Sequence, residues 1–154
     1  MIRSVLRLGG VCVLALLLGC GEGRTPAVGA TELVTADEAR LPAAPVLVPR
    51  GGITRGPGIK VISPPPGARV KAPFELKVDF QAHGGSRIDA SSVKVVYLRE
   101  PLVDLTPRLA SGISEAGIRQ AGLSVPPGPH DLEVEVTDSE GRTRSQTLSF
   151  TVVE

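Results

Sequence analysis

The sequence predicts an all-β fold, a two-layer sandwich of antiparallel strands that occupies residues 59–154. Short runs of alternating apolar and polar residues recur along this part of the chain, separated by Gly, Pro, Asp and Ser. About seven such runs in roughly 100 residues is the spacing of a β-sandwich. Their period of two is that of strands with one buried and one solvated face, and a sustained helical period is almost absent.

The first half of this region contains three expected strands. A brief strand is predicted over residues 59–62, and the proline-rich turn at residues 63–67 ends it. The clearest strand covers residues 74–81, where four apolar side chains alternate with polar ones. Residues 92–99 form a third strand that is apolar on both faces near its end, which suits a central position in a sheet.

The second half is irregular before it becomes clear again. Residues 102–105 are expected to form an edge strand, and residues 117–123 fit either a strand or a short helical turn. Residues 131–137 alternate strictly, a turn follows at residues 138–141, and the chain returns through alternating residues 147–152. These last runs predict a terminal hairpin.

Residues 20–58 are expected to form a disordered, flexible linker. The segment is rich in Gly, Pro and Ala, it has no aromatic residue, and its prolines oppose a long helix. One short helix is compatible with it, because Thr35 and Glu38 have the spacing of a capping box. A flexible chain of this length has a root-mean-square span of about 35 Å. The linker therefore predicts a domain held well away from its anchor.

The N-terminus has the pattern of a secretory signal. Two arginines precede an apolar stretch over residues 8–18, which is too short to span a bilayer. Residues 17–20, Leu-Leu-Gly-Cys, resemble the lipobox of bacterial lipoproteins, although Leu18 stands where a small or β-branched residue is commoner. In that family the peptide is cut before the cysteine, which implies a signal peptide over residues 1–19 and a lipid on Cys20. A plain exported protein and an uncleaved signal anchor are the alternatives.

The lipoprotein resemblance implies how the chain is held. Several acyl chains on Cys20, palmitate among them, would anchor it durably in a membrane of the bacterial cell envelope. Gly21, where Asp would favour retention in the inner membrane, points to the outer membrane, at its periplasmic face or at the cell surface. Cys12 leaves with the signal peptide, so no disulfide is expected. The 17 Lys and Arg nearly cancel the 16 Asp and Glu and are interspersed with them, which argues against a nucleic-acid partner.

Two segments resemble bacterial immunoglobulin-like domains. Residues 127–142 resemble the last hairpin of that family, in which a Gly-x-His turn leads into an alternating strand and an Asp-x-x-Gly turn leads out. Residues 62–70 resemble its opening, a Ser-Pro followed by Gly and Val. The resemblance implies a single immunoglobulin-like sandwich over residues 59–154, without the Cys pair and Trp of antibody domains. Members serve as spacers, adhesin repeats, enzyme appendages and binding modules, so the fold does not fix a function.

No pattern in the sequence indicates an enzyme, a cofactor or a metal centre. His130 and Asp131 are adjacent, but no serine lies in a nucleophile elbow, and His130 is expected to be partly exposed near a strand end. Two histidines cannot supply the ligands of a zinc or copper site. Asp138 and Glu140 could offer oxygens to calcium, but turn geometry accounts more simply for Asp138 and Gly141.

The expected function is that of a non-catalytic interaction or scaffolding module, with an unidentified envelope protein as partner. Arg99, Glu100, Asp104 and Arg108 border the least regular region and are the candidate contact surface, although a solvated rim is the simpler interpretation. An envelope glycan is the alternative ligand. Sugars stack on exposed aromatic rings, however, and Tyr97 is expected to be partly buried on a central strand with its hydroxyl bonded to a partner.

Overall fold

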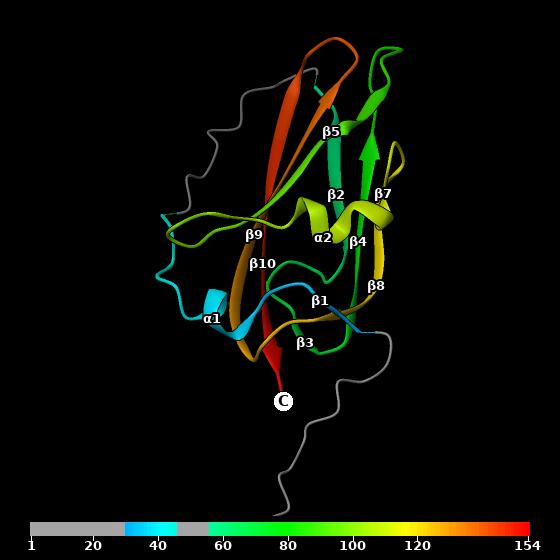
Figure 1. Ribbon diagram of the computed structural model, residues 1–154. Coiled ribbons are helices and arrows are strands. Elements are labelled where there is room, and N and C mark those ends of the chain that lie inside the picture. Colours follow the sequence, from blue (N-terminus) through cyan, green and yellow to red (C-terminus); the bar gives the residue numbers. More distant parts are fainter. Residues whose placement is uncertain (1–29, 46–55) are drawn as a thin grey trace, which may run out of the picture.

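The computed structural model describes residues 30–45 and 56–154, and these residues form an all-β sandwich (Figure 1). Two five-stranded sheets pack face to face around one core. The expected all-β sandwich is therefore confirmed. The signal segment, Cys20 and residues 46–55 lie outside the described residues, so lipidation stays a prediction.

The first sheet has the strand order β1–β8–β4–β2, and β7 pairs with β8. All its pairings are antiparallel except that of β1, which runs parallel to the end of β8. The strand β4 has the bounds that its alternation predicted, and residues 117–123 are a strand rather than a helical turn. The members are β1 (Thr31–Glu32), β2 (Gly58–Ser63), β4 (Phe74–Gln81), β7 (Ile113–Ser114) and β8 (Gly117–Ser124).

The second sheet has the order β3–β10–β9–β5–β6. Its centre is the predicted terminal hairpin, β9 with β10, and β6 is the predicted edge strand in a shorter form. The strand β3 runs parallel to β10, so the sandwich is not wholly antiparallel. The members are β3 (Arg69–Lys71), β5 (Ile88–Tyr97), β6 (Val103–Asp104), β9 (Gly128–Asp138) and β10 (Thr143–Val153).

Helical structure is limited to short connections. The helix α1 (Ala36–Ala39) begins at the predicted capping box, since the Thr35 hydroxyl accepts from the amide of Glu38 and the Glu38 carboxylate accepts from the amide of Thr35. A second helix, α2 (Thr106–Leu109), continues into a 3-10 turn, Ala110–Gly112, and carries the chain from one sheet to the other. No helix among the described residues has the length and apolar character needed to cross a membrane.

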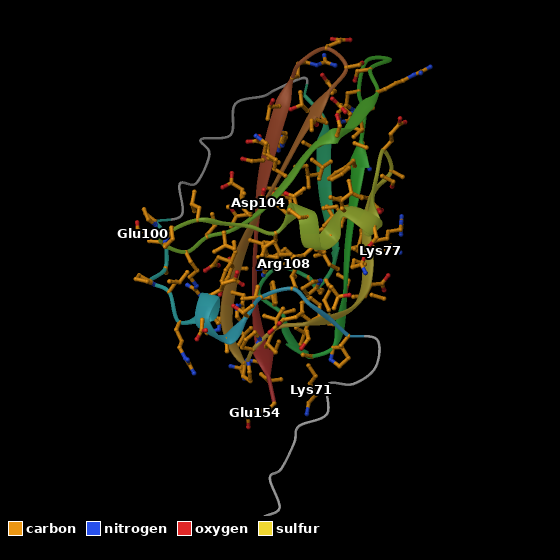
Figure 2. The ribbon with its side chains drawn as sticks, viewed as in Figure 1. Lys71, Lys77, Glu100, Asp104, Arg108 and Glu154 are labelled. Atoms are coloured by element: carbon orange, nitrogen blue, oxygen red, sulfur yellow. The ribbon has the colours of Figure 1, made fainter. Side chains whose placement is uncertain are left out.

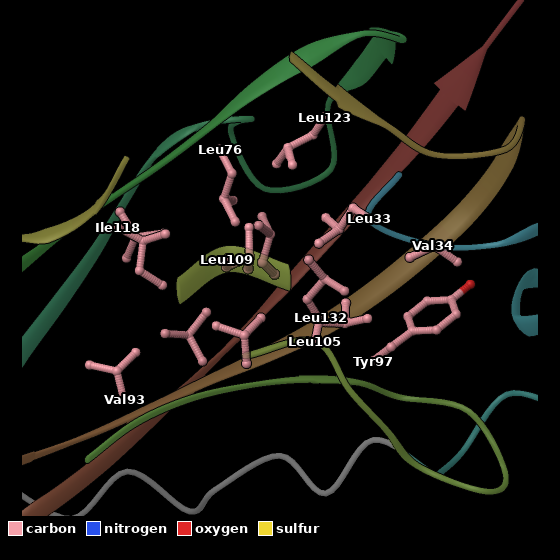
Figure 3. Close-up of a cluster of buried hydrophobic side chains, with 14 of the residues drawn as sticks. Leu33, Val34, Leu76, Val93, Tyr97, Leu105, Leu109, Ile118, Leu123 and Leu132 are labelled. Atoms are coloured by element: carbon pink, nitrogen blue, oxygen red, sulfur yellow. The ribbon is translucent and has the colours of Figure 1, made fainter. Parts of the chain in front are cut away.

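The core lies between the sheets and is built by strict alternation. In β9 the side chains of Leu132, Val134 and Val136 point inward and are fully buried, while the residues between them are partly exposed. Because an inward-facing residue occurs at every second position, the longer strands contribute to one continuous apolar layer. Figure 3 shows part of this cluster, in which side chains of α2 and of the N-terminal segment join those of the strands.

Residues 30–45, which the sequence placed in the linker, belong to the sandwich. We call this segment the N-terminal strap. Its side chains Leu33 and Val34 are 0% and 1% exposed, and they lie against the core beside Tyr97 (Figure 3). At its other end the amide of Ala44 donates to the carbonyl of Leu98 at 3.2 Å. The expectation of a wholly separate linker is wrong for these residues, because Leu33 and Val34 are part of the core. Two adjacent buried residues are too short a run to show periodicity, so no pattern in the sequence indicated this contact.

Replacing Leu33 by Ala is expected to lower the free energy of unfolding by about 2–5 kcal/mol, because a buried leucine is lost and a cavity remains. Urea unfolding followed by circular dichroism measures the difference. The control is Leu102→Ala, at an exposed leucine, with an expected change within about 0.5 kcal/mol. A Leu33→Ala protein as stable as the parent would show that the strap is not part of the cooperative core.

Candidate functional site

The four residues of the expected contact surface do not form one free surface. Arg99 is only 7% exposed, and it donates from Nε to the Tyr97 hydroxyl at 3.0 Å and from Nη2 to the Pro129 carbonyl at 2.8 Å. Its guanidinium also lies over the Tyr97 ring, 4.9 Å from the centroid. Of the four residues, only Glu100 and Asp104, both labelled in Figure 2, are exposed. Arg99 therefore stabilises the interior of the domain and is not part of an exposed contact surface.

Arg108 holds the N-terminal strap. Its two terminal nitrogens donate to the two carboxylate oxygens of Glu38, each at 2.7 Å, in a bidentate ion pair. The Nη1 atom also donates to the carbonyl of Leu33 at 2.7 Å. Planar, two-bond pairing of this kind fixes direction as well as distance. The arginine of α2 thus binds both the backbone and the helix of the strap.

The same contacts set the ionisation of Glu38. The hydrogen bond from Arg108 lowers the pKa of Glu38 to about 2, against the smaller effect of burial, which raises it. The bond from the Thr35 amide and the positive charge of Arg108 lower it further. Conversely, the bond to Glu38 raises the pKa of the Arg108 guanidinium. Glu38 therefore stays ionised, and one carboxylate both caps α1 and clamps α2.

His130 is buried, so the expectation of partial exposure is wrong. It is 2% exposed, and both ring nitrogens are hydrogen-bonded: Nε2 to the Pro126 carbonyl at 2.8 Å and Nδ1 to the Tyr97 hydroxyl at 2.8 Å. A carbonyl only accepts, so Nε2 carries the proton and Nδ1 accepts from Tyr97. The Tyr97 oxygen in turn accepts from Arg99. Tyr97 is fully buried with its hydroxyl bonded, which goes further than the partial burial expected for it.

The surroundings of His130 favour the neutral form of its imidazole. Burial lowers the pKa of His130, and the charge of Arg99 lowers it further, while the bond to Pro126 and the charge of Asp131 act the other way. Burial likewise raises the pKa of Tyr97. Asp131 follows His130 on the strand and so points to the opposite face, where it accepts from the Ser149 hydroxyl at 2.5 Å. The two adjacent residues are therefore not a base and its orienting acid.

Asp138 closes the turn between β9 and β10, as its sequence context predicted. Its Oδ1 accepts from the amides of Glu140 and Arg142, each at 3.0 Å, and its Oδ2 accepts from the Arg142 guanidinium at 2.8 Å. Burial raises the pKa of Asp138, but these bonds outweigh it and the pKa is lowered. Among the described residues no three His, Cys, Asp or Glu side chains are grouped as metal ligands would be. Both oxygens of Asp138 thus serve the turn.

An apolar side chain is exposed in the loop between β5 and β6, residues 98–102. Leu102 is 62% exposed, and it is the one large hydrophobic residue with such exposure in the described ranges. The loop is fixed at its base, because the amide of Leu98 donates to the Asp131 carbonyl at 2.9 Å and that of Glu100 to the Pro42 carbonyl at 2.9 Å. Next to the loop, the Asp104 carboxylate accepts from the amide of Thr106, the first residue of α2, at 2.8 Å. Sequence reasoning placed the candidate surface here but missed Leu102.

Other members of the site were missed for a different reason. The partnership of Glu38 with Arg108 joins residues 70 apart, and neither position carries a local signal of the other. The capping box did single out Glu38, but only as the start of a helix. The burial of His130 had a signal, since it occupies the same face of the strand as Leu132 and Val134.

Comparison with known proteins identifies no family. No family model and no curated protein matches the sequence. Similar solved structures include the endo-β-1,4-mannanase from Thermotoga petrophila, at 15% identity over 67% of this chain and 21% of that chain, with a TM-score of 0.44. CopC from Methylosinus trichosporium OB3b is 17% identical over 62% and 93% of the chains, with a TM-score of 0.42. The fibronectin(III)-like modules of Clostridium thermocellum CbhA are 16% identical over 62% and 94%, with a TM-score of 0.38. This chain spans only a fraction of the mannanase, and likenesses at this level carry no argument about function.

The clamp between Glu38 and Arg108 predicts a pH dependence that Glu38→Gln removes. The pKa of Glu38 is lowered from 4.5 to about 2, so its contribution to stability is full above pH 4.5 and is lost as the pH falls through 2. The variant is expected to unfold at lower urea concentration than the parent at pH 6, and this difference should shrink between pH 4.5 and 2.

The control for this titration is Asp37→Asn, because Asp37 lies on the same helix with a side chain 93% exposed. This variant is expected to follow the parent at every pH. A constant difference between Glu38→Gln and the parent down to pH 2 would contradict the assignment of the ion pair.

Proposed function

We propose that the protein is a lipid-anchored lipoprotein of the bacterial cell envelope whose sandwich acts as a non-catalytic protein-interaction module. The anchor is the lipid on Cys20, and the proposal for it rests on the N-terminal sequence pattern. The outer membrane is the proposed location, from Gly21 after the cysteine. The module itself is the sandwich with its strap, residues 30–154.

The observation that most supports a non-catalytic role is that the reactive side chains serve internal contacts. Both ring nitrogens of His130 and both oxygens of Asp138 are bonded within the domain. Arg108 is clamped to the strap and Arg99 to Tyr97. Side chains fixed in this way position loops, and the surface that remains for function is made of loops and strand edges.

The loop at residues 98–102 is the proposed contact surface. An exposed leucine on a loop whose base is hydrogen-bonded offers apolar area without a large ordering cost on binding. The carboxylates of Glu100 and Asp104 flank Leu102 and would select a partner with a basic rim. A partner protein of the envelope with a small apolar pocket and nearby cations fits this chemistry.

The burial of Tyr97 removes the support for the alternative function, glycan binding. Stacking on a sugar needs an exposed aromatic face, and Tyr97 is fully buried under Arg99 and beside His130. The sequence contains no Trp. No observation therefore favours a second function.

The anchor is tested by Cys20→Ser in the bacterium that produces the protein. The variant is expected to leave the membrane fraction and to lose incorporation of labelled palmitate, because the thiol that accepts the lipid is absent. Cys12→Ser is the matched control and should change neither readout. Membrane attachment that persists in Cys20→Ser would contradict lipidation.

The contact surface is tested by a photo-crosslinking residue at position 102 in the anchored protein. One envelope protein is expected to be captured from this position and not from position 115, an exposed site in the turn between β7 and β8. The substitutions Glu100→Lys and Asp104→Lys together should abolish capture without lowering the melting temperature by more than a few degrees. Equal capture from positions 102 and 115 would count against a specific surface.

A further inference from the structure

Arg99 carries a buried positive charge that no carboxylate balances. Among the described residues it forms no ion pair, whereas Arg108 and Arg142 each bind a carboxylate. The partners of Arg99 are all neutral: the hydroxyl and the ring of Tyr97 and the carbonyl of Pro129. Burying a charge without an opposite charge is costly, so Arg99 stays in the interior only through these neutral partners.

One hydroxyl group separates this arginine from the imidazole of His130. The Tyr97 oxygen accepts from Nε of Arg99 at 3.0 Å, and its hydrogen is donated to Nδ1 of His130 at 2.8 Å. The direction of both bonds is fixed, because Nε2 of His130 must donate to the Pro126 carbonyl. The arrangement therefore requires a neutral imidazole.

A proton added to Nδ1 of His130 would disrupt this arrangement. The Tyr97 oxygen would then receive hydrogen bonds from two cations at once, and neither cation could accept the phenolic hydrogen. Tyr97 is 0% exposed, so no solvent reaches that hydrogen. An unbonded donor and two facing positive charges are both unfavourable in an interior of low dielectric. Protonation of His130 and burial of Arg99 therefore oppose each other.

The other groups around His130 do not compensate a second positive charge. Tyr97 faces it from β5 and Phe150 from β10, with the ring centroids 5.7 Å apart in each case. Asp131, the next residue of β9, lies on the opposite face of the sheet. Glu38 of the strap is held in its ion pair. Burial lowers the pKa of His130 and outweighs the charge of Asp131, which raises it.

The guanidinium of Arg99 can leave the interior more easily than the imidazole of His130 can. The imidazole is on β9, the central strand of its sheet, between β10 and β5. Arg99 lies in the loop 98–102, and rotation of its long side chain is enough to bring the guanidinium to water. The backbone of the loop would stay in place, since the amides on either side of Arg99 donate to carbonyls of β9 and of the strap.

We therefore propose that His130 and Arg99 form a pH-sensitive switch, in which a proton on His130 expels the Arg99 guanidinium to the surface of the β5–β6 loop. There the cation neighbours Glu100 and offsets the charge that Glu100 and Asp104 present to a partner. A partner with a basic rim then binds more weakly at acidic pH. This last step rests on the proposed function, to which it adds the regulation of the contact surface.

The chain contains one tyrosine and no tryptophan, so its tyrosine fluorescence reports on Tyr97 alone. The fluorescence of the lipidated full-length protein in detergent is titrated from pH 7.5 to 4.5. A transition is expected with its midpoint below pH 6.5, because burial and the charge of Arg99 lower the pKa of His130 from that value. The far-ultraviolet circular dichroism should not change, since the backbone stays in place.

Two matched variants assign this transition to a histidine. His130→Gln should lose it, because glutamine does not titrate in this range. His83→Gln replaces the only other histidine, which is exposed in the loop between β4 and β5, and should keep it. The absence of a transition in the parent, or its persistence in His130→Gln, would overturn the switch.

The role of Arg99 has its own readouts. Arg99→Met removes the charge, so the midpoint is expected to rise toward pH 6.5, and this variant keeps the test valid if His130→Gln fails to fold. In protein labelled with nitrogen-15, the Nε–H signal that disappears in Arg99→Met belongs to Arg99. Above the midpoint it should exchange with water about tenfold more slowly than that of Arg40, whose side chain is 79% exposed, and below the midpoint at a similar rate. Slow exchange that persists below the midpoint would overturn the expulsion of Arg99.

Photo-crosslinking from position 102 separates this inference from the proposed function. Capture by the parent is expected to fall by about threefold or more between pH 7.5 and a pH below the midpoint, whereas His130→Gln and Arg99→Met should capture equally at both. Equal capture by the parent at both pH values would overturn the regulation and leave the contact surface standing. No capture at either pH would overturn the contact surface, and the fluorescence and exchange measurements would still decide whether the switch exists.

Discussion

The carboxylate of Glu38 is bound at the same time by the amide of its own helix cap and by both terminal nitrogens of Arg108. Through this one group the strap is fastened to α2, the element that carries the chain between the sheets. Leu33 and Val34 lie beside the clamp and fill the core there, and Leu105 and Leu109 from the α2 side are equally buried. Apolar burial supplies the larger share of the free energy, while the ion pair sets the geometry in which that burial occurs.

A second constraint comes from polar groups that are buried and fully bonded. Arg99, Tyr97 and His130 form a directed series of hydrogen bonds that ends on the Pro126 carbonyl. No buried side-chain nitrogen or oxygen among the described residues is without a partner. In a low-dielectric interior each of these bonds is costly to break, so the series ties the β8–β9 connection to β5. Groups that look reactive in the sequence therefore act as fixed supports.

Docking of the strap shortens the stretch of chain between the folded domain and Cys20. If its residues had remained outside the fold, the domain would be free to sample a large volume above a membrane. With the strap docked, the connection to Cys20 is short and enters at a defined end. If the proposed lipid is attached to Cys20, the distance between the domain and the membrane would depend on the docking of the strap near residue 30 and not only on the composition of the linker. The strap also contacts the β5–β6 loop, because the amide of Glu100 donates to the carbonyl of Pro42.

The sequence by itself determined the all-β class, the strand β4 and the terminal hairpin, because their alternation records which face is buried and needs no knowledge of the partner strand. It also determined the capping box at Thr35 and the turn at Asp138, whose hydrogen bonds span at most four residues. Only the tertiary structure decided that the strap belongs to the domain, that His130 is buried and that Arg108 meets Glu38. Each of these depends on groups distant in the chain, brought together when the two sheets close, and no local pattern encodes such a meeting. The strand β1 is the clearest example of an element that sequence alone does not predict, since its two residues acquire their conformation from β8 and not from their own propensity.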